Sequence, residues 1–132
     1  MFHLSIVTPE KVVVDTEVKS LVVPGTEGYL GVLSHHAPLI TALKTGRIEY
    51  RDANDQVQLI AVTGGFLEVS NNKATILADA IEYASEIDIA RARAAYERNK
   101  QRIVDYTSGK ESDIDLPQTR AALDRASNRI KI

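Results

Sequence analysis

Apolar and polar residues alternate in short runs through residues 1–84, and turn-forming residues separate the runs. In the first run, FHLSIV, the apolar residues Phe2, Leu4 and Ile6 fall on one side and the polar residues on the other. This period of two is typical of a half-buried β-strand. The pair Asn71-Asn72 indicates a tight hairpin, because Asn tolerates a positive φ. The further expected strands are KVVVDT, EVKSLVVPG, GYLGVL, GRIEYRD, QVQLIAVTGG, GFLEVSNN and KATILADA. Many short strands joined by turns predict a β-sandwich or a flattened barrel.

The pattern changes near Asp88. Apolar positions then recur at the spacing of a helix, with one polar residue in the middle of the stripe. The stripe comprises Ile89, Ala92, Tyr96, Asn99, Ile103 and Tyr106. Asp88 or Ser85 can cap the start of such a helix, and Gly109 suits its end. We therefore expect an α-helix between these caps.

A second helix is expected after the polar connection TSGKESDID. It begins near Asp115-Leu116-Pro117, because proline fits the first turn of a helix. Its apolar stripe repeats every seven residues from Leu116 to Leu123 and Ile130, with alanines in between. Two stripes of small apolar residues predict an antiparallel helical hairpin with closely spaced backbones. Such short helices are marginal alone, so the hairpin must pack on itself, on the sandwich or on a partner.

The boundary between the two parts is also a boundary in charge. Residues 1–84 contain six Lys or Arg against ten Asp or Glu, a net charge of −4, and residues 85–132 contain ten against eight, a net charge of +2. We therefore expect a β + α fold, with a β-sandwich domain over residues 1–84 and a two-helix hairpin over residues 85–132. The hairpin lacks a dense basic run and its acids lie between its bases, so no nucleic-acid partner is expected.

The sequence also disfavours several kinds of chemistry. It contains no cysteine, which excludes disulfides and thiolate metal sites. No apolar run reaches the roughly 18 residues of a membrane-spanning helix, so membrane association is expected only through a partner. Nucleophile-elbow, Walker-type and zinc-protease motifs do not occur. His35-His36 is expected in a surface turn rather than at a metal, because adjacent residues of an extended chain point to opposite sides. We therefore expect neither catalytic residues nor a metal site.

Arginines mark the hairpin. Residues seven apart return to nearly the same face of a helix, so Arg91 and Arg98 share a face and Arg102 lies one turn beyond. In the second helix Arg125 and Arg129 are neighbours by the same rule. If the two helices fold back on each other, up to five guanidinium groups converge and form a site for an anion.

A simpler interpretation stays open. The arginines can belong to a solvated face on which Glu97, Asp105 and Asp124 act as ion-pair partners. Arg93 points away from the other arginines in either case, because it lies on the other face of the first helix.

Three motifs resemble the epsilon subunit of F-type ATP synthases. They are GYLGVLSHHAPLITALKTG, AVTGGFLEVSNNKATILAD and EIDIARARAA, in that order, and the resemblance covers essentially the whole chain. It implies a ten-stranded β-sandwich followed by a C-terminal two-helix hairpin. It further implies a noncatalytic rotor subunit of the central stalk, which couples proton translocation to ATP synthesis. The implied location is peripheral, on the cytoplasmic face of the cell membrane or, alternatively, on the thylakoid.

The resemblance also implies partners and a ligand. The sandwich would bind the gamma subunit and the c-ring, and the hairpin would extend toward the alpha/beta catalytic head and inhibit ATP hydrolysis. ATP would be a regulatory ligand of the folded hairpin, and no other cofactor is implied. The ATP-binding residues implied in this way are Glu82, Ile87, Asp88, Arg91, Ala92, Arg98, Arg125 and Arg129. Arg102 is a neighbour outside this set, and Arg93 is expected to be dispensable.

The gamma and c-ring interface is expected around SHHAPLITAL. The expected interface residues are Tyr29, His36, Pro38, Leu39 and Leu43. The alternative is that Leu39, Ile40 and Leu43 belong to the core. Tyr29 and Ser34 depart from the family pattern, which often has an acidic residue and proline there. A second class of function also stays open, a free-standing binding module whose hairpin recruits a protein partner.

Overall fold

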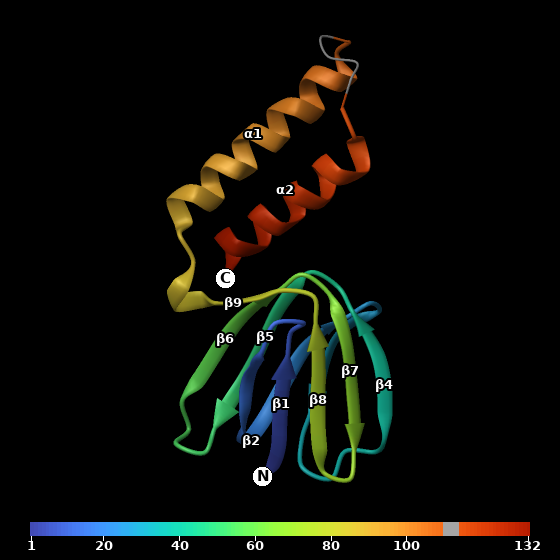
Figure 1. Cartoon of the computed structure of the whole chain (residues 1–132), viewed down its shortest axis with the longest axis vertical. Coiled ribbons are helices and arrows are strands. Elements are labelled where there is room, and N and C mark those ends of the chain that lie inside the picture. Colours follow the sequence, from blue (N-terminus) through green and yellow to red (C-terminus); the bar gives the residue numbers. More distant parts are fainter. Residues whose placement is uncertain (110–113) are drawn as a thin grey trace. The chain divides into compact units, whose positions relative to one another are not determined.

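The computed structural model describes residues 1–109 and 114–132. Contacts between residues divide the chain into two compact units, Met1–Ser85 and Glu86–Ile132. The first unit is built of strands and the second of two helices (Figure 1). None of the described helices combines the length and the apolar character that a membrane crossing requires.

Nine strands make up the first unit within the described residues, and a 3-10 turn, Ala84–Glu86, follows them. The strands are β1 (Phe2–Val7), β2 (Val12–Gly25), β3 (Gly28–Val32), β4 (Leu39–Leu43), β5 (Gly46–Asp52), β6 (Val57–Val62), β7 (Gly65–Ser70), β8 (Lys73–Ala78) and β9 (Ile81–Tyr83).

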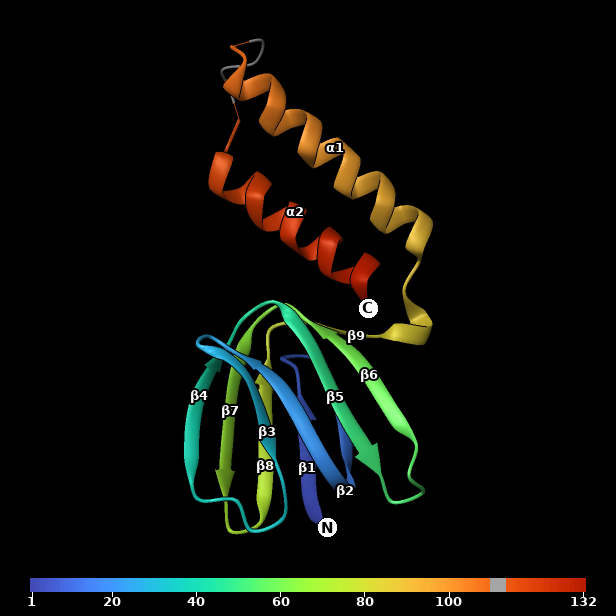
Figure 2. The same cartoon turned by 180° about the vertical axis from the view of Figure 1, so that it is seen from behind.

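The strands form two layers that face each other. In one layer β1 lies parallel to β8, and β8, β7 and β4 follow in antiparallel order. In the other layer β2 pairs with β3 and β5, and β6 and β9 continue from β5. Figures 1 and 2 show the two layers from opposite sides. The first half of β2 also pairs with β1, so this long strand joins the layers and gives the sandwich that the alternating pattern predicts.

The strand count differs from the ten that the resemblance implies. The runs KVVVDT and EVKSLVVPG read as two separate strands, but both lie in the single 14-residue strand β2. Its ladder with β5 is irregular between Val18 and Ser20. Near this irregularity β2 passes from pairing with β1 to pairing with β5, since Val18 is the last residue paired with β1. One strand therefore serves both layers without a turn.

Local features of the sandwich follow the sequence pattern. The residues of β1 alternate between buried and half-buried, with Phe2, Leu4 and Ile6 inside. Asn71 and Asn72 adopt φ values of 51° and 58°, and they connect β7 to β8 in the expected tight hairpin. The core contains the apolar residues that point inward from both layers. Its fully buried members with the largest side chains include Leu4, Ile6, Leu21, Ile48, Ile60, Leu67 and Ile76.

The second unit consists of α1 (Ile89–Thr107) and α2 (Leu116–Lys131). Asp88 caps α1, because its side chain accepts a hydrogen bond from the Arg91 N–H at 3.0 Å. Asp115 caps α2 in the same way, with a 3.1 Å bond from the Gln118 N–H. Gly109 follows α1 at a φ of 80°, as expected for a residue just past a helix end. The expected start of each helix, with Asp88 rather than Ser85 as the cap of α1, and the expected end of α1 are therefore confirmed. Four residues of the connection, 110–113, lie outside the described residues.

The helices of the hairpin pack through small and polar side chains. The buried residues are Ala92 and Asn99 on α1 and Thr119 and Ala126 on α2. Each pair is seven residues apart, and in an antiparallel hairpin this spacing sets Ala92 opposite Ala126 and Asn99 opposite Thr119. Asn99, the polar residue of the expected stripe, is thus buried between the helices, whereas Ile89 of the same stripe is 52% exposed. The fully buried part of the interface is consequently small and half polar, and the larger apolar residues of both helices, Tyr96, Ile103, Leu116, Leu123 and Ile130, are only half-buried.

Candidate functional site

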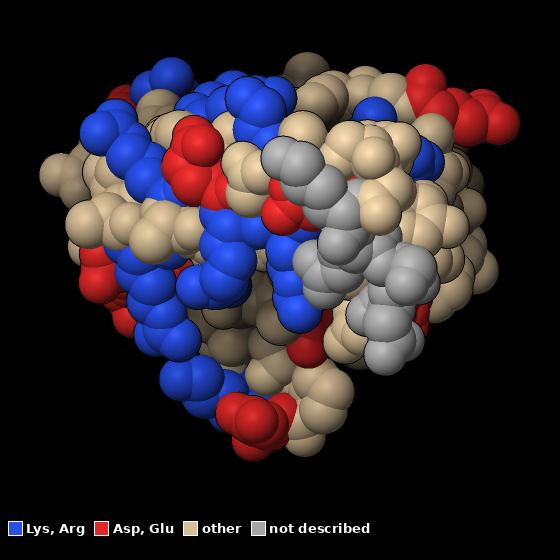
Figure 3. Space-filling model, turned by 90° about the horizontal axis from the view of Figure 1, so that it is seen from above, with Lys and Arg blue, Asp and Glu red and all other residues tan. Residues whose placement is uncertain are grey.

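One groove of the hairpin carries most of its arginines. Successive helical residues are about 100° apart. Relative to the buried stripe of α1, this places Arg91, Arg98 and Arg102 together on one flank. The same geometry places Arg125 and Arg129 on the α2 flank that borders the same groove. Figure 3 shows Lys and Arg atoms gathered on the face seen from above, with acidic atoms among them. The expected convergence of arginines from both helices therefore fits the geometry of the hairpin.

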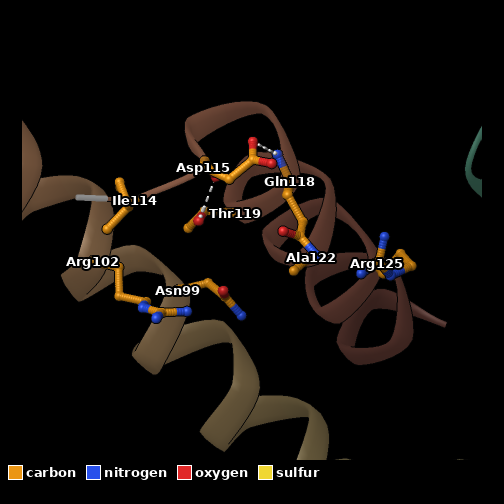
Figure 4. A pocket seen from close by; sticks show the side chains of 8 residues that line it. All are labelled: Asn99, Arg102, Ile114, Asp115, Gln118, Thr119, Ala122 and Arg125. Carbon is orange, nitrogen blue, oxygen red and sulfur yellow. Dashed lines mark hydrogen bonds between the residues drawn. The ribbon is translucent and has the colours of Figure 1, made fainter.

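Part of this groove deepens into a pocket of about 250 Å³. Figure 4 shows side chains of both helices around it, with Arg102 and Asn99 on α1 facing residues of α2. The residues that line it are Asn99, Arg102, Ile114, Asp115, Gln118, Thr119, Ala122 and Arg125. Most of this lining is polar, and it brings together one arginine from each helix.

For three of these arginines the described residues offer no ion-pair partner. No carboxylate of this part of the chain lies within 4.0 Å of the guanidinium groups of Arg98, Arg102 or Arg125. Asp105, one of the expected partners, instead accepts a 2.9 Å hydrogen bond from Gln101. Positive charges that lack such a partner favour the binding of an anion.

The remaining residues of the expected ATP set lie at the start of α1 or before it. Asp88 is the helix cap described above, and Ala92 is buried in the hairpin interface. Ile87 is half-buried immediately before the cap. Glu82 lies on β9, where it pairs with Ala61 of β6, and so belongs to the first compact unit.

Six lining residues of the pocket were not predicted as site residues, and three of them, Asn99, Gln118 and Thr119, have uncharged polar side chains. Asn99 is only 7% exposed, and its amide donates a 2.8 Å hydrogen bond to the Ala95 carbonyl oxygen. Thr119 is 6% exposed and its hydroxyl donates to the Asp115 carbonyl oxygen, while Gln118 lies beside it in the first turn of α2. The sequence did offer a signal for Asn99, because it is the one polar residue in the apolar stripe of the first helix. Nothing comparable marked the two residues of α2, because their role depends on the register between the helices.

The expected interface residues of the sandwich fall into two groups. Tyr29 on β3 is 57% exposed, and Pro38 is exposed in the loop before β4. His36 lies half-buried in the same loop, where its N–H donates to the Leu33 carbonyl oxygen. Leu39, by contrast, packs partly against the core, and Leu43 is a core residue with 6% exposure. The alternative that assigned Leu39, Ile40 and Leu43 to the core therefore describes Leu39 and Leu43 better, but it is wrong for Ile40, which is 74% exposed.

The outer face of β4, β7 and β8 carries apolar side chains that sequence reasoning missed. Ile40 is 74% exposed, Phe66 58% and Leu77 57%. Phe66 pairs with Leu77 on β8 and with Ala42 on β4, so the three side chains form one row across the strands. We call Ile40, Ala42, Phe66 and Leu77 the outer apolar row. Large apolar side chains grouped on a surface are typical of an interaction site.

Comparison with known proteins gives two family matches that together span the chain. Residues 1–84 match the ATP synthase delta/epsilon chain, beta-sandwich domain, and residues 85–132 match the ATP synthase delta/epsilon chain, long alpha-helix domain. A relative named ATP synthase epsilon chain from Pelotomaculum thermopropionicum is 50% identical over 105 residues, which is 80% of this chain and 78% of the relative. A relative of the same name from Desulforamulus reducens is 48% identical over 101 residues, 76% of each chain.

A solved structure has a similar fold at low sequence identity. A chain in the mitochondrial ATP synthase of Euglena gracilis superimposes with a TM-score of 0.80 at 20% identity. The match covers 95% of this chain and 76% of the other. At this level of identity the similarity concerns the fold alone.

Proposed function

The chain belongs to the ATP synthase delta/epsilon chain family, and on this basis we propose that it is a central-stalk subunit whose helical hairpin regulates ATP hydrolysis. As an epsilon chain it is a noncatalytic subunit of the ATP synthase. In the proposal, the sandwich binds the gamma subunit and the c-ring and so couples proton translocation to ATP synthesis. The hairpin acts on the alpha/beta catalytic head, and membrane association at the cytoplasmic face is through these partners.

The packing of the hairpin supports a regulatory role. Its buried positions are two alanines, an asparagine and a threonine, which bury little apolar surface compared with leucine-rich helix pairs. A contact of this kind stabilises the folded hairpin only modestly, so a second arrangement that docks on a partner can compete with it. The hairpin is also a compact unit of its own, so it can rearrange while the sandwich stays folded.

The outer apolar row supports the assignment of a stalk partner to the sandwich. Ile40, Phe66 and Leu77 would be covered by the gamma subunit, while Tyr29 and Pro38 would contribute to the c-ring side. Replacing Phe66 or Ile40 by Asp should prevent copurification with gamma while leaving the isolated sandwich folded, because both side chains are exposed. Leu43→Asp is a contrasting variant, which should unfold the sandwich. If Phe66→Asp and Ile40→Asp chains both assemble normally, this row is not the interface.

The observation that carries the ligand proposal is the groove that gathers arginines of both helices, in which Arg98, Arg102 and Arg125 have no carboxylate partner among the described residues. We assign ATP as the regulatory ligand, with phosphate oxygens on Arg91, Arg98, Arg125 and Arg129. Ile87, Asp88 and Ala92 would lie toward the adenine end. Several guanidinium groups in one groove repel each other, and a triphosphate relieves this repulsion. Binding would favour the folded hairpin by the difference in affinity between its two arrangements.

Calorimetry on the full-length chain tests whether ATP binds to the hairpin. Arg91→Ala and Arg125→Ala should abolish ATP binding, and Arg93→Ala, which removes the same charge from the other face of α1, should leave it intact. If millimolar ATP gives neither binding heat nor thermal stabilisation, the ligand proposal is wrong and the arginines belong to a solvated face.

Removal of the hairpin tests whether it inhibits ATP hydrolysis. A chain ending after residue 84 should fold and assemble, and the resulting complex should hydrolyse ATP faster than the complex with the full-length chain. Equal hydrolysis rates in the two complexes would contradict the regulatory role. If the chain neither copurifies with gamma nor changes hydrolysis, it is a free-standing binding module instead.

A further inference from the structure

We propose that Asn72 is a positioning residue for partner binding, whose side chain holds the turn after β3 and Met1 together as one preformed contact. We call residues 33–38 together with Met1 the contact tip. The inference rests on the proposed binding of the gamma subunit to the sandwich. It adds a residue of the β7–β8 hairpin that the expected interface set does not contain.

The segment that contains most of the tip is free of charged side chains. Residues 28–43 contain no Asp, Glu, Lys or Arg, whereas these residues make up 26% of the chain. Much of the segment is nevertheless at the surface, since Leu33 is 64% exposed and Ile40 74%. Ala37 and Pro38, which lie between them, are exposed as well. Depletion of charge is typical of the centre of a protein–protein interface, so this surface suits a protein partner.

The tip and the outer apolar row belong to the same stretch of chain. Pro38, the last residue of the tip, directly precedes β4, and Ile40 of the row is two residues further on. Met1, which is 57% exposed, adds an apolar side chain to the tip. A partner that covers Ile40 therefore comes within reach of the tip. We accordingly assign the tip to gamma, the partner that we assigned to the row.

The tip is built on a tight turn with one costly backbone conformation. The His36 N–H donates to the Leu33 carbonyl oxygen at 3.1 Å, which closes a four-residue turn. His35, the third residue of this turn, has a φ of 61°. A positive φ at this position is typical of a type II turn, which favours Gly or Asn there. A histidine keeps this conformation only where its surroundings hold it.

Asn72 holds the turn from the β7–β8 hairpin. Its side-chain oxygen accepts from the His35 N–H at 2.8 Å, and its side-chain nitrogen donates to the Met1 carbonyl oxygen at 3.1 Å. The Ser34 hydroxyl donates to the same Met1 oxygen at 2.8 Å. The Asn72 carbonyl oxygen accepts from the His3 N–H at 3.2 Å. One side chain thus links three segments, which Figures 1 and 2 show at the same end of the sandwich.

A preformed tip should raise the affinity for gamma. A surface that is ordered before binding loses less conformational freedom on association than a surface that the partner has to order. Without the Asn72 side chain, His35 can leave its positive φ, and the Met1 oxygen keeps only the Ser34 hydroxyl as a donor. The exposed Leu33 side chain would then sample several positions. Asn72 therefore acts through the turn and need not contact gamma itself.

Glycine substitutions at the two asparagines of the hairpin separate positioning from stability. Asn72→Gly removes both side-chain hydrogen bonds, yet the sandwich should be at least as stable as the wild type, because Asn-Gly is a preferred pair for a two-residue hairpin. Asn71→Gly is the matched control. Asn71 has a φ of 51°, close to the 58° of Asn72, and its side chain forms no hydrogen bond within the described part of the chain.

Association is measured by titrating each full-length chain into a purified complex of the catalytic head and gamma that lacks this chain. Asn72→Gly should weaken association by about tenfold, because it removes two hydrogen bonds that order the tip. Its His35 amide should exchange with solvent faster by a similar factor. Asn71→Gly should match the wild type in both measurements.

Leu33→Ser tests whether Asn72 acts through the tip. This substitution removes an exposed side chain, so the sandwich should stay folded while association weakens. Asn72→Gly added to Leu33→Ser should then weaken association by much less than tenfold, because the anchor that it positions is already gone. Full additivity of the two losses would overturn the positioning role.

The outcomes distinguish this inference from the proposed function. If the wild type associates and Asn72→Gly associates as tightly as Asn71→Gly, the positioning role is wrong and the binding of gamma stands. A loss of association in Asn72→Gly that is accompanied by a lower urea midpoint of the sandwich would also overturn the role, because the residue would then act on the stability of the fold. Failure of the wild-type chain to associate would contradict both the inference and the proposed function.

Discussion

Enlarging a buried alanine should open the hairpin. Ala126 on α2 is 1% exposed, and Ala92 on α1, its expected counterpart, is 3% exposed. A leucine at either position adds three carbon atoms where the helix backbones approach each other. The helices must then separate or tilt, because a close-packed interface has no space for the added atoms. Ala121 lies on the exposed side of α2, so Ala121→Leu is a control with the same change of side chain.

The size of the effect can be worked from the packing. Overpacking of a buried position costs about 1–3 kcal/mol. A free-energy change of this size alters the ratio of open to folded hairpin by about 5–150-fold. The hairpin has little stability to lose, since its helices have 19 and 16 residues and its buried positions are small or polar. The sandwich should be unaffected, because it is a separate compact unit.

Hydrogen exchange read by mass spectrometry measures this directly. Amides of α1 and α2 should exchange about 5–150 times faster in Ala126→Leu and Ala92→Leu than in the wild type, and amides of β1–β8 should exchange at the wild-type rate. In Ala121→Leu both groups should match the wild type. Exchange rates in the two buried variants that stay within twofold of the control would refute the inferred antiparallel alanine layer.

Two further predictions concern the sandwich. The pKa of His3 is raised by hydrogen bonds from its ring to Asp15 and then to Glu17, so the protonated histidine stabilises the β1–β2 pair. This stabilisation is fully present below the unfolded pKa of about 6.5 and is lost as pH rises through the higher folded value. Urea unfolding at pH 5.5 and 8.5 should therefore show a loss of stability with rising pH that His3→Gln reduces; an unchanged pH dependence in His3→Gln would contradict the assignment. Gly65→Ala should lower the stability of the sandwich by about 3 kcal/mol or more, because Gly65 has a φ of 142° and a Cβ there would clash with the Leu77 carbonyl oxygen. Gly31→Ala, where a Cβ meets nothing within 4 Å, is its control, and equal urea midpoints for the two variants would show the reasoning to be wrong.

The parts of the fold that the sequence predicted are those set by local physics. The alternation in β1, the Asn71-Asn72 hairpin and the caps at Asp88 and Asp115 each depend on residues within a few positions of each other. Strands β4 and β9 were not predicted. LITAL does not alternate cleanly, and β9 has three residues that are all half-buried, so neither carries a period that reveals a strand. Their pairing with β7 and β6 comes from the tertiary structure.

The candidate site was predictable only to the level of one helix. Helical spacing alone shows that Arg91, Arg98 and Arg102 share a flank. Which residues of α2 face them depends on the register between the helices, and the polar residues in the connection give no estimate of that register. The pocket residues Gln118 and Thr119 therefore emerge only once the two helices are packed. The core position of Leu43 was likewise undecided, because an apolar residue in a short run fits a core and an interface equally well.

The weakness of the hairpin interface and the charge of its groove have one physical consequence in common. The buried layer of Asn99 and Thr119, beside the layer of Ala92 and Ala126, fixes the register, because any slip would leave a polar side chain against apolar neighbours. The same layer keeps the apolar contribution small, so packing holds the hairpin folded only weakly. Arginines that face each other across the groove weaken it further, in proportion to how little counter-charge lies nearby. An anion that bridges the helices reverses this last contribution and leaves the packing unchanged. A ligand of the proposed kind would therefore shift the balance between the folded hairpin and the proposed extended arrangement, whereas a leucine-rich interface would stay folded with or without it.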